Sequence, residues 1–193
     1  PAPMNGSQLF GVLYGSQFKF DKEKMPAEID ALREKLMKEY EEGEKPERKK
    51  RILLTGCPSS GAPMKVVKAI EEHGGNVVVY ENCGGAKSVD RLIDEDAEDI
   101  YKAIAERYLA IGCSVMTPDN NRIELMGRLL EEYNIEGVVE MTLQACHTYN
   151  IEAKSIEKFV KSKGLPYIHV ETDYSRADIG QLDTRIAAFL EMI

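Results

Sequence analysis

The sequence predicts an α/β fold of the Rossmann or flavodoxin-like class, with a four-stranded, mainly parallel sheet of order 2-1-3-4 flanked by helices. Short apolar runs alternate with amphipathic segments from residue 51 onward, which is typical of βαβ units. The runs at 52–54 and 77–80 are short and rich in Ile, Leu and Val, as expected of parallel strands buried on both faces. Strands joined in this way take right-handed crossovers.

The residues before this alternation predict an extension with one helix. Residues 1–25 are interrupted by glycines and read as irregular. Pro26 then opens a helix whose apolar residues recur at spacings of three and four. The polar segment 41–50 is broken by Gly and Pro and marks a boundary. We therefore expect an N-terminal extension over 1–50 and an α/β domain over 51–193.

The elements of the α/β domain follow from the same patterns. Apolar runs predict strands at 52–54, 77–80, 137–143 and 166–171. Amphipathic periodicity predicts helices at 64–75, 88–98, 99–111, 121–134, 151–164 and 179–193. A loop around Cys113 separates two of these helices.

Composition limits the classes of partner. The chain has 193 residues, 43% hydrophobic and 30% charged, which suits a globular protein with a real core. Its net charge of −8 would repel a phosphate backbone, so we expect no nucleic-acid partner. No apolar run approaches the ~20 residues of a membrane span, and the amino end does not resemble a signal peptide. We expect a cytoplasmic protein with reduced thiols and no membrane partner.

The placement of the four cysteines is the main functional signal. Cys57, Cys83 and Cys146 each follow a predicted strand, and Cys113 lies in a loop. Carboxyl ends of parallel strands share one edge, where ligands bind, so these thiols are expected to meet there. Thiolates suit zinc or iron–sulfur clusters, although no CxxC pair is present. For each cysteine the alternative is a small buried core residue.

The turn NCGGAK at 82–87 is a second candidate. Asn82, Gly84 and Gly85 could contact a cofactor, because glycines let the backbone approach a ligand closely. The amino end of a following helix would offer N–H groups to an anion and lower the pKa of the Cys83 thiol. The turn matches neither GxGxxG nor GxxxxGK[ST], so the sequence does not support a dinucleotide or Walker-type loop. Tight strand–helix packing is the alternative interpretation.

Other polar residues allow more than one interpretation. The turn at 57–61 resembles a thiolate phosphate-binding loop only superficially, since no Arg closes it. His147 could donate a proton or simply be solvated, and a Cys146–His147 nucleophile is disfavoured because adjacent residues at a strand end point to opposite sides. Arg122 and Arg185 either face the sheet edge or form ordinary surface ion pairs.

Several longer strings resemble one known family. GCPSSG, ENCGGAKSVDRLIDEDAED, AIGCSVMTPDNNR, MTLQACHTYNIEAKSIEKFV and VETDYSRADIGQLDTRIAAFLEM resemble the carboxyl-terminal half of the 2-hydroxyacyl-CoA dehydratase component and benzoyl-CoA reductase family, and most closely its double-cubane cluster protein branch. The resemblance covers roughly residues 7–193. It implies two α/β domains that hold an oxygen-sensitive iron–sulfur cluster, of [4Fe–4S] or double-cubane type, between them. It also implies an ATP-dependent iron–sulfur activator protein that supplies low-potential electrons.

The resemblance assigns roles to particular residues. It implies that Cys83, Cys113 and Cys146 are cluster ligands and that Cys57 is either a further ligand or a buried neighbour. It also places His147 near the cluster, together with Tyr174 of the segment ETDYS, as proton donors or hydrogen-bond partners.

The expected function is therefore that of the carboxyl-terminal domain of an ATP-activator-dependent, low-potential iron–sulfur reductase or 2-hydroxyacyl-CoA dehydratase-like enzyme. Its substrate would be an acyl-CoA or another small molecule. The resemblance does not include the family's amino-terminal domain, so the chain would be either a fragment of a longer protein or a single-domain relative. We expect the fragment, inactive alone and partnered by that domain or a second subunit and by the activator. An isolated half would leave its ligand-bearing edge open to self-association as a homodimer. The alternatives are a non-enzymatic flavodoxin-like binding module with structural or redox-regulated thiols, and a thiol-based transferase.

Overall fold

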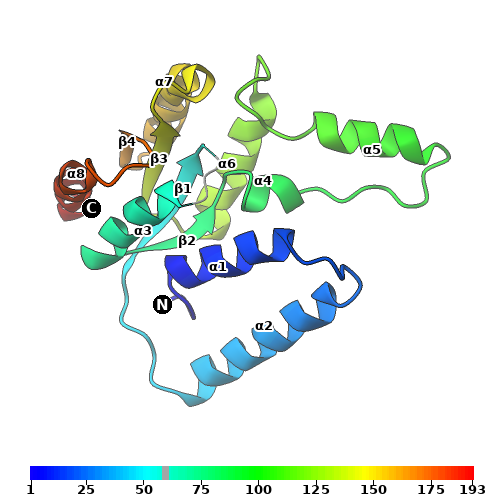
Figure 1. Ribbon diagram of the computed structural model, residues 1–193, viewed down its shortest axis with the longest axis horizontal. Helices are drawn as coiled ribbons and strands as arrows, with labels where there is room; N and C mark the ends of the chain where they lie inside the picture. Colours follow the sequence, from blue (N-terminus) through cyan, green and yellow to red (C-terminus); the bar gives the residue numbers. More distant parts are fainter. Residues whose placement is uncertain (58–60) are drawn as a thin grey trace.

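The sheet has the predicted order and direction. The computed structural model describes residues 1–57 and 61–193, and its four strands are β1 (Lys50–Gly56), β2 (Gly75–Tyr80), β3 (Gly137–Leu143) and β4 (Tyr167–Thr172). They are arranged β2-β1-β3-β4, and every neighbouring pair is parallel (Figure 1). All four strands therefore end at one side of the sheet, which we call the carboxyl edge.

Helices cover both faces of the sheet. They are α1 (Gly6–Gln17), α2 (Met25–Glu42), α3 (Ala62–Glu72), α4 (Ala86–Val89), α5 (Ile100–Leu109), α6 (Asn120–Glu132), α7 (His147–Ser162) and α8 (Ile179–Glu191). Residues of α1, α3 and α8 share one core layer, and those of α6 share the other with Ile156 and Val160 of α7. In Figure 1, α2 and α5 stand away from this body.

The central strand β1 joins the two layers. Ile52 and Leu54 pack with α3 and α8, whereas Leu53 packs with α6 and α7, and all three are fully buried. Alternation of side chains along a strand explains this division. Burying each such side chain is worth about 1.5–3 kcal/mol, so β1 anchors both layers.

The amino-terminal segment differs from the prediction. Residues expected to be irregular form α1, which begins with a reciprocal pair of hydrogen bonds between Asn5 and Gln8. Phe10 is buried and packs against Tyr80, with ring centroids 5.5 Å apart. A capped start and this aromatic contact outweigh the glycines, each of which costs about 1 kcal/mol in a helix.

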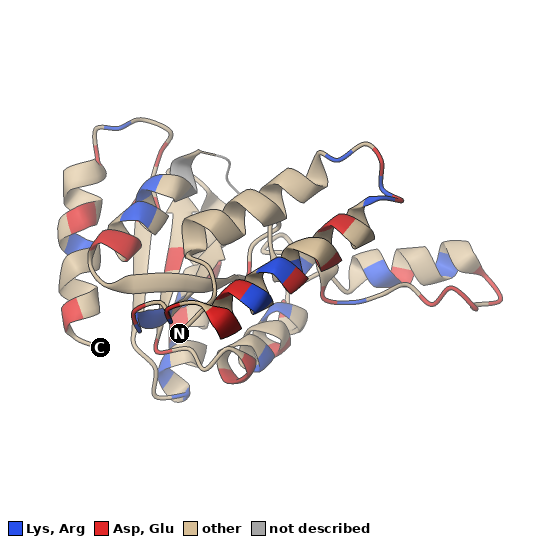
Figure 2. Cartoon of the chain, turned by 90° about the horizontal axis from the view of Figure 1, so that it is seen from below, with Lys and Arg blue, Asp and Glu red and all other residues tan. Residues whose placement is uncertain are grey.

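Two other predicted boundaries change. The helix expected over 88–98 is reduced to the four-residue α4, because the acidic residues that follow provide no apolar face; they form the acidic stretch before α5 in Figure 2. Helix α7 begins at His147, earlier than the predicted residue 151.

The expected helix α2 is present, carries charges along its length and has no buried residue (Figure 2). Within the described residues, no helix has both the length and the apolar character needed to cross a membrane.

Candidate functional site

A glycine at the end of β1 directs Cys57 toward β3. Gly56 has φ of 111°, and a Cβ there would lie 2.0 Å from the carbonyl oxygen of Met141, so only glycine fits. The amide of Cys57 donates to that oxygen at 2.8 Å, and its Sγ accepts from the amide of Leu143 at 3.3 Å. Cys57 is therefore buried between the two strands. Residues 58–60 of the turn weighed as a phosphate loop lie outside the described residues.

Cys146 meets Cys57 at this point. It follows Ala145, whose φ of 64° is in the left-handed region, and it forms the cap of α7. The two thiols lie close enough to influence each other's pKa. Burial raises the pKa of Cys57 to about 12. Burial would also raise the pKa of Cys146, but hydrogen bonds from the amide of Tyr149 and from Cys57 lower it overall.

The turn after β2 presents Cys83 to solvent. The side chain of Asn82 is buried and accepts from the amide of Gly84 at 3.0 Å. A Cβ on Gly85 would lie 2.1 Å from the carbonyl oxygen of Tyr80, so close packing alone requires that glycine. Although Cys83 is exposed, the surrounding atoms partly desolvate its thiol and raise its pKa despite the nearby Lys87, so the predicted lowering is wrong. Helix α4 is too short to supply a strong helix end.

Cys113 completes a second pair. It lies half-buried in the loop between α5 and α6 and is close enough to Cys83 for the two thiols to interact electrostatically. Cys57 and Cys146 are thus neighbours, and Cys113 lies within electrostatic range of Cys83. Over the described ranges 1–57 and 61–193, no three His, Cys, Asp or Glu side chains gather closely enough to hold a single metal ion.

The two predicted proton donors also lie at the carboxyl edge. His147 is the exposed first residue of α7, and Tyr174 follows β4 with 68% of its surface exposed. Arg185 does not reach this site, since it is an exposed side chain that donates to the carbonyl oxygen of His169 at 2.7 Å.

Beneath the thiols lies a buried charge network that sequence reasoning missed. It consists of Thr55, Glu81, Lys87, Arg122, Glu140 and Glu152. The guanidinium of Arg122 donates to Thr55 at 2.8 Å and to Glu140 at 3.0 Å, lies 3.4 Å from Glu81, and also bonds Glu152. The surface ion-pair interpretation of Arg122 is therefore wrong, because its side chain has no exposed area. The sequence contains one indication of this network, because the glutamate within the mainly apolar run GVVEMTL would be buried and would need a partner.

The network carries more carboxylates than cations, and their pKa values reflect this. Burial raises the pKa of Glu140 even though Arg122 opposes the shift. At the margin of the network, burial and the neighbouring Glu152 raise the pKa of Asp119 to about 6. Asp119 therefore takes up a proton at mildly acidic pH, near the carboxyl edge.

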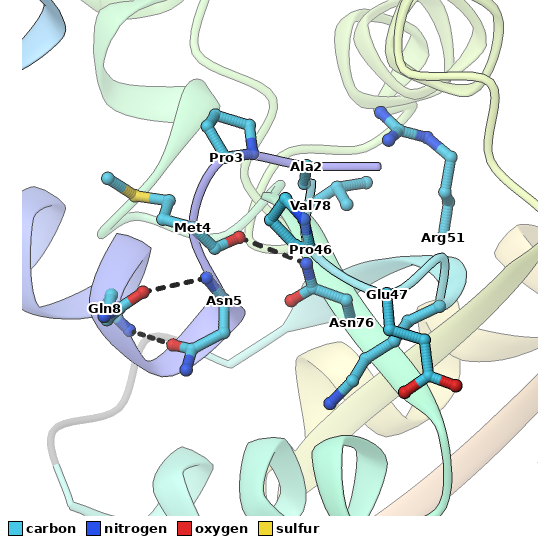
Figure 3. A pocket seen from close by; sticks show the side chains of 11 residues that line it. Ala2, Pro3, Met4, Asn5, Gln8, Pro46, Glu47, Arg51, Asn76 and Val78 are labelled. Carbon is cyan, nitrogen blue, oxygen red and sulfur yellow. Dashed lines mark hydrogen bonds between the residues drawn. The ribbon is translucent and has the colours of Figure 1, made fainter. Parts of the chain in front are cut away.

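One cavity lies next to the thiols and another does not. A cavity of about 570 Å³ is lined by the loop after Cys113, including Ser114 and Asp119, and by Thr148 and Glu152 of α7. The cavity in Figure 3, of about 270 Å³, includes Arg51 near the start of β1 and lies at the opposite end of the sheet. Its position separates it from every predicted site residue.

These features define an α/β domain that presents thiols, two candidate proton donors and a cavity at one sheet edge. A family model described as 2-hydroxyglutaryl-CoA dehydratase, D-component, matches residues 1–193. The chain belongs to this family, as the resemblance predicted.

Curated relatives agree with this assignment. The chain is 48% identical to the putative dehydratase subunit YjiM of Escherichia coli (strain K12), over 100% of this chain and 50% of that protein. It is 23% identical to a subunit of the benzoyl-CoA reductase of Thauera aromatica, over 79% of this chain and 36% of the relative. It is 25% identical to the beta subunit of (R)-2-hydroxyglutaryl-CoA dehydratase of Acidaminococcus fermentans, over 51% of this chain and 27% of that protein. The chain spans half or less of the length of each relative.

Proposed function

We propose that this chain is the cluster-facing part of an ATP-activator-dependent, low-potential iron–sulfur reductase or 2-hydroxyacyl-CoA dehydratase-like enzyme. The observation that carries the proposal is the position of Cys57, Cys83 and Cys146 directly after three neighbouring parallel strands, at one sheet edge of a chain from this family. The names of the relatives, which include a benzoyl-CoA reductase subunit and a 2-hydroxyglutaryl-CoA dehydratase subunit, support an acyl-CoA or similar small substrate.

The donor set fits an iron–sulfur cluster better than a single ion. A tetrahedral zinc ion needs its ligands within about 2.3 Å of one point, and three such side chains do not converge in the described residues. A cluster takes one thiolate on each of several iron atoms and so accepts more widely spaced thiols. Cys83, Cys113 and Cys146 would hold it, and Cys57 would be a ligand or its hydrogen-bonding neighbour. When bound, the cluster would supply single electrons at low potential.

The residues of this chain would then donate protons to the substrate and provide space for it. His147 and Tyr174 are exposed at the carboxyl edge, where each could give a proton to a reduced substrate. The cavity beside Cys113 offers space for a small molecule within the same edge. The complementary half of the enzyme, as a second domain or subunit, is a proposed partner, since the curated relatives are named as subunits. The activator is a further proposed partner, which the family resemblance implies.

Anaerobic purification of the polypeptide in its native full-length form, with any subunit that co-purifies, tests the proposal. We expect brown protein that contains iron and acid-labile sulfide and accepts electrons from the reduced activator when ATP is hydrolysed. Cys83→Ser, Cys113→Ser and Cys146→Ser should lose most of the iron, whereas Ser88→Ala, in the same short helix as Lys87, should retain it. Cys57→Ala distinguishes a ligand, which loses iron, from a neighbour, which keeps it.

Two outcomes bear on the remaining assignments. His147→Gln and Tyr174→Phe should lower turnover without changing the iron content, as expected of proton donors. Colourless protein without iron after anaerobic cluster reconstitution would refute the proposal and favour a binding module whose thiols are structural or redox-regulated.

A further inference from the structure

The cavity beside Cys113 has an apolar wall. Its volume of about 570 Å³ is in the range of small-molecule sites. The apolar side chains that line it are Val115, Met116, Ile123, Ile151 and Ile156. Val115 is 70% exposed and Ile151 is 77% exposed, so part of this wall is in contact with water. An occupant with an apolar body would cover that surface and gain hydrophobic stabilisation.

The charged side chains that line the cavity are all acidic. They are Asp119, at the start of α6, and Glu152 of α7, and none of the described lining residues is Lys, Arg or His. Arg122 bonds Glu152, but its side chain has no exposed area and is not open to an occupant. The lining therefore repels a carboxylate or a phosphate and attracts a cation.

Asp119 also lacks a hydrogen-bond donor on one of its oxygens. Its Oδ1 accepts from the amide of Arg122 at 3.3 Å, and this contact begins α6. Its Oδ2 is shielded from water and has no hydrogen-bond partner in the part of the chain that the structure describes. An unpaired carboxylate oxygen in such a place costs free energy, and a positively charged N–H donor bound in the cavity would offset that cost.

The cavity shares a wall with two segments that carry thiols. Thr148 lines it, and the Sγ of Cys146 lies 3.8 Å from the hydroxyl oxygen of Thr148. Ser114, which follows Cys113 in the chain, donates to the same oxygen at 3.3 Å. A bound molecule would therefore lie at the carboxyl edge, beside the segments of Cys113 and Cys146.

We propose that this cavity binds a small organic ammonium ion, with its charged group toward Asp119 and Glu152 and its apolar body against the isoleucine-rich wall. Binding itself needs no cluster and so goes beyond the function proposed above. That the bound cation is the group on which the enzyme acts rests on that function. A CoA moiety, with its phosphates, would lie outside the cavity.

The first experiment compares three probes of equal chain length, n-butylammonium, n-butanol and butyrate, in cluster-free full-length protein. Methyl NMR spectra follow Ile123, Ile151 and Ile156, whose signals are assigned by Ile→Val substitution. We expect n-butylammonium to shift these signals and to bind at least about tenfold more tightly than n-butanol, with no binding of butyrate. Equal affinity for the amine and the alcohol, binding of butyrate, or unshifted signals with all three probes would overturn the proposal.

The second experiment uses substitutions in the lining. Asp119→Asn keeps an acceptor for the amide that begins α6 and removes the charge, so it should lower the affinity for n-butylammonium to about that for n-butanol. Asp99→Asn makes the same change at the cap of α5, outside the lining, and should leave the affinity unchanged. Full affinity in Asp119→Asn, or an equal loss in Asp99→Asn, would contradict a site at Asp119.

A cavity-filling pair tests the site without altering its charges. Ser155 is an exposed lining residue of α7, so Ser155→Trp should abolish binding of n-butylammonium, whereas Ser162→Trp, at the exposed end of the same helix, should not. Retained binding in Ser155→Trp would overturn the cavity as the site. Cation binding in a protein that takes up no iron would support this inference and refute the cluster function, and iron uptake without cation binding would do the reverse.

Discussion

The guanidinium of Arg122 lies 3.0 Å from the carboxylate of Glu140, and neither side chain has any exposed surface. Arg122 is in α6 and Glu140 in β3, so the pair ties a helix to the centre of the sheet. Because Arg122 also bonds Glu81 and Glu152, one cation organises three carboxylates directly beneath the carboxyl edge. The position of the thiol-bearing loops thus depends on an interior ionic contact.

We predict that Arg122→Met destabilises the protein by about 3–5 kcal/mol, because it leaves Glu81 and Glu140 buried without their partner. Urea or guanidinium unfolding monitored by circular dichroism gives the difference in free energy. Arg128→Met is the matched control, since Arg128 is exposed and makes a two-point contact with Asp90, and it should cost at most about 1 kcal/mol. Equal losses in the two variants would show that the buried network does not stabilise the fold.

Asp119 gives a prediction for pH dependence. An unfolded Asp titrates near 3.8, whereas burial and Glu152 raise the pKa of Asp119 in the folded protein to about 6. The folded state therefore binds this proton more tightly, so its contribution is complete below about pH 4 and is lost as the pH rises through about 6. Since the group is partly exposed, we expect a contribution on the order of 1 kcal/mol.

The measurement is the free energy of unfolding of the wild type and of Asp119→Asn between pH 4 and 7. Asn still accepts the hydrogen bond from the amide of Arg122 that begins α6, so the helix cap is kept. The wild type should lose stability relative to Asp119→Asn as the pH rises. Asp99→Asn makes the same change at the exposed cap of α5 and should follow the wild type. Parallel curves for Asp119→Asn and the wild type would contradict the prediction.

The sheet was predictable from sequence and the interior ions were not. Strand–helix alternation was enough for the order β2-β1-β3-β4, because parallel strands with right-handed crossovers leave few arrangements. It was also enough to bring the strand-end cysteines to one edge. Arg122 and Lys87 were not predictable as buried, because periodicity treats a charged residue as solvated and ion pairs over long sequence separations leave no local pattern.

Local helix propensity also gave the wrong prediction for two segments. Helix α1 is stabilised because Phe10 packs against Tyr80, which is distant in the sequence. The glycines of the segment predict irregular structure, and this contact cannot be predicted from them. The acidic residues after α4 had helix-forming composition but no apolar face to pack, so they remained irregular. In both cases packing across the molecule, and not the residue preference, decided the structure.

We predict that Ala145→Gly stabilises the fold by about 1 kcal/mol. Ala145 has φ of 64°, where a Cβ is strained and glycine is not. Chemical unfolding again measures the change. Asn134→Gly is the matched control, because Asn134 has φ of 48° but asparagine tolerates this region, so its effect should be only a few tenths of a kcal/mol. Loss of stability in Ala145→Gly would mean that the turn before Cys146 is not strained.

The two contacting thiols should react very differently. Cys57 is buried with its pKa raised to about 12, whereas Cys146 is partly exposed and hydrogen bonds lower its pKa. Since the thiolate is the reactive form, iodoacetamide should modify Cys146 at least about tenfold faster than Cys57 in the native, cluster-free protein at mildly alkaline pH. Mass spectrometry of peptides from timed samples measures both rates, and the same reaction in guanidinium chloride should make them similar. Comparable rates in the native protein would mean that Cys57 reaches solvent. They would contradict its interior position between β1 and β3, next to Cys146.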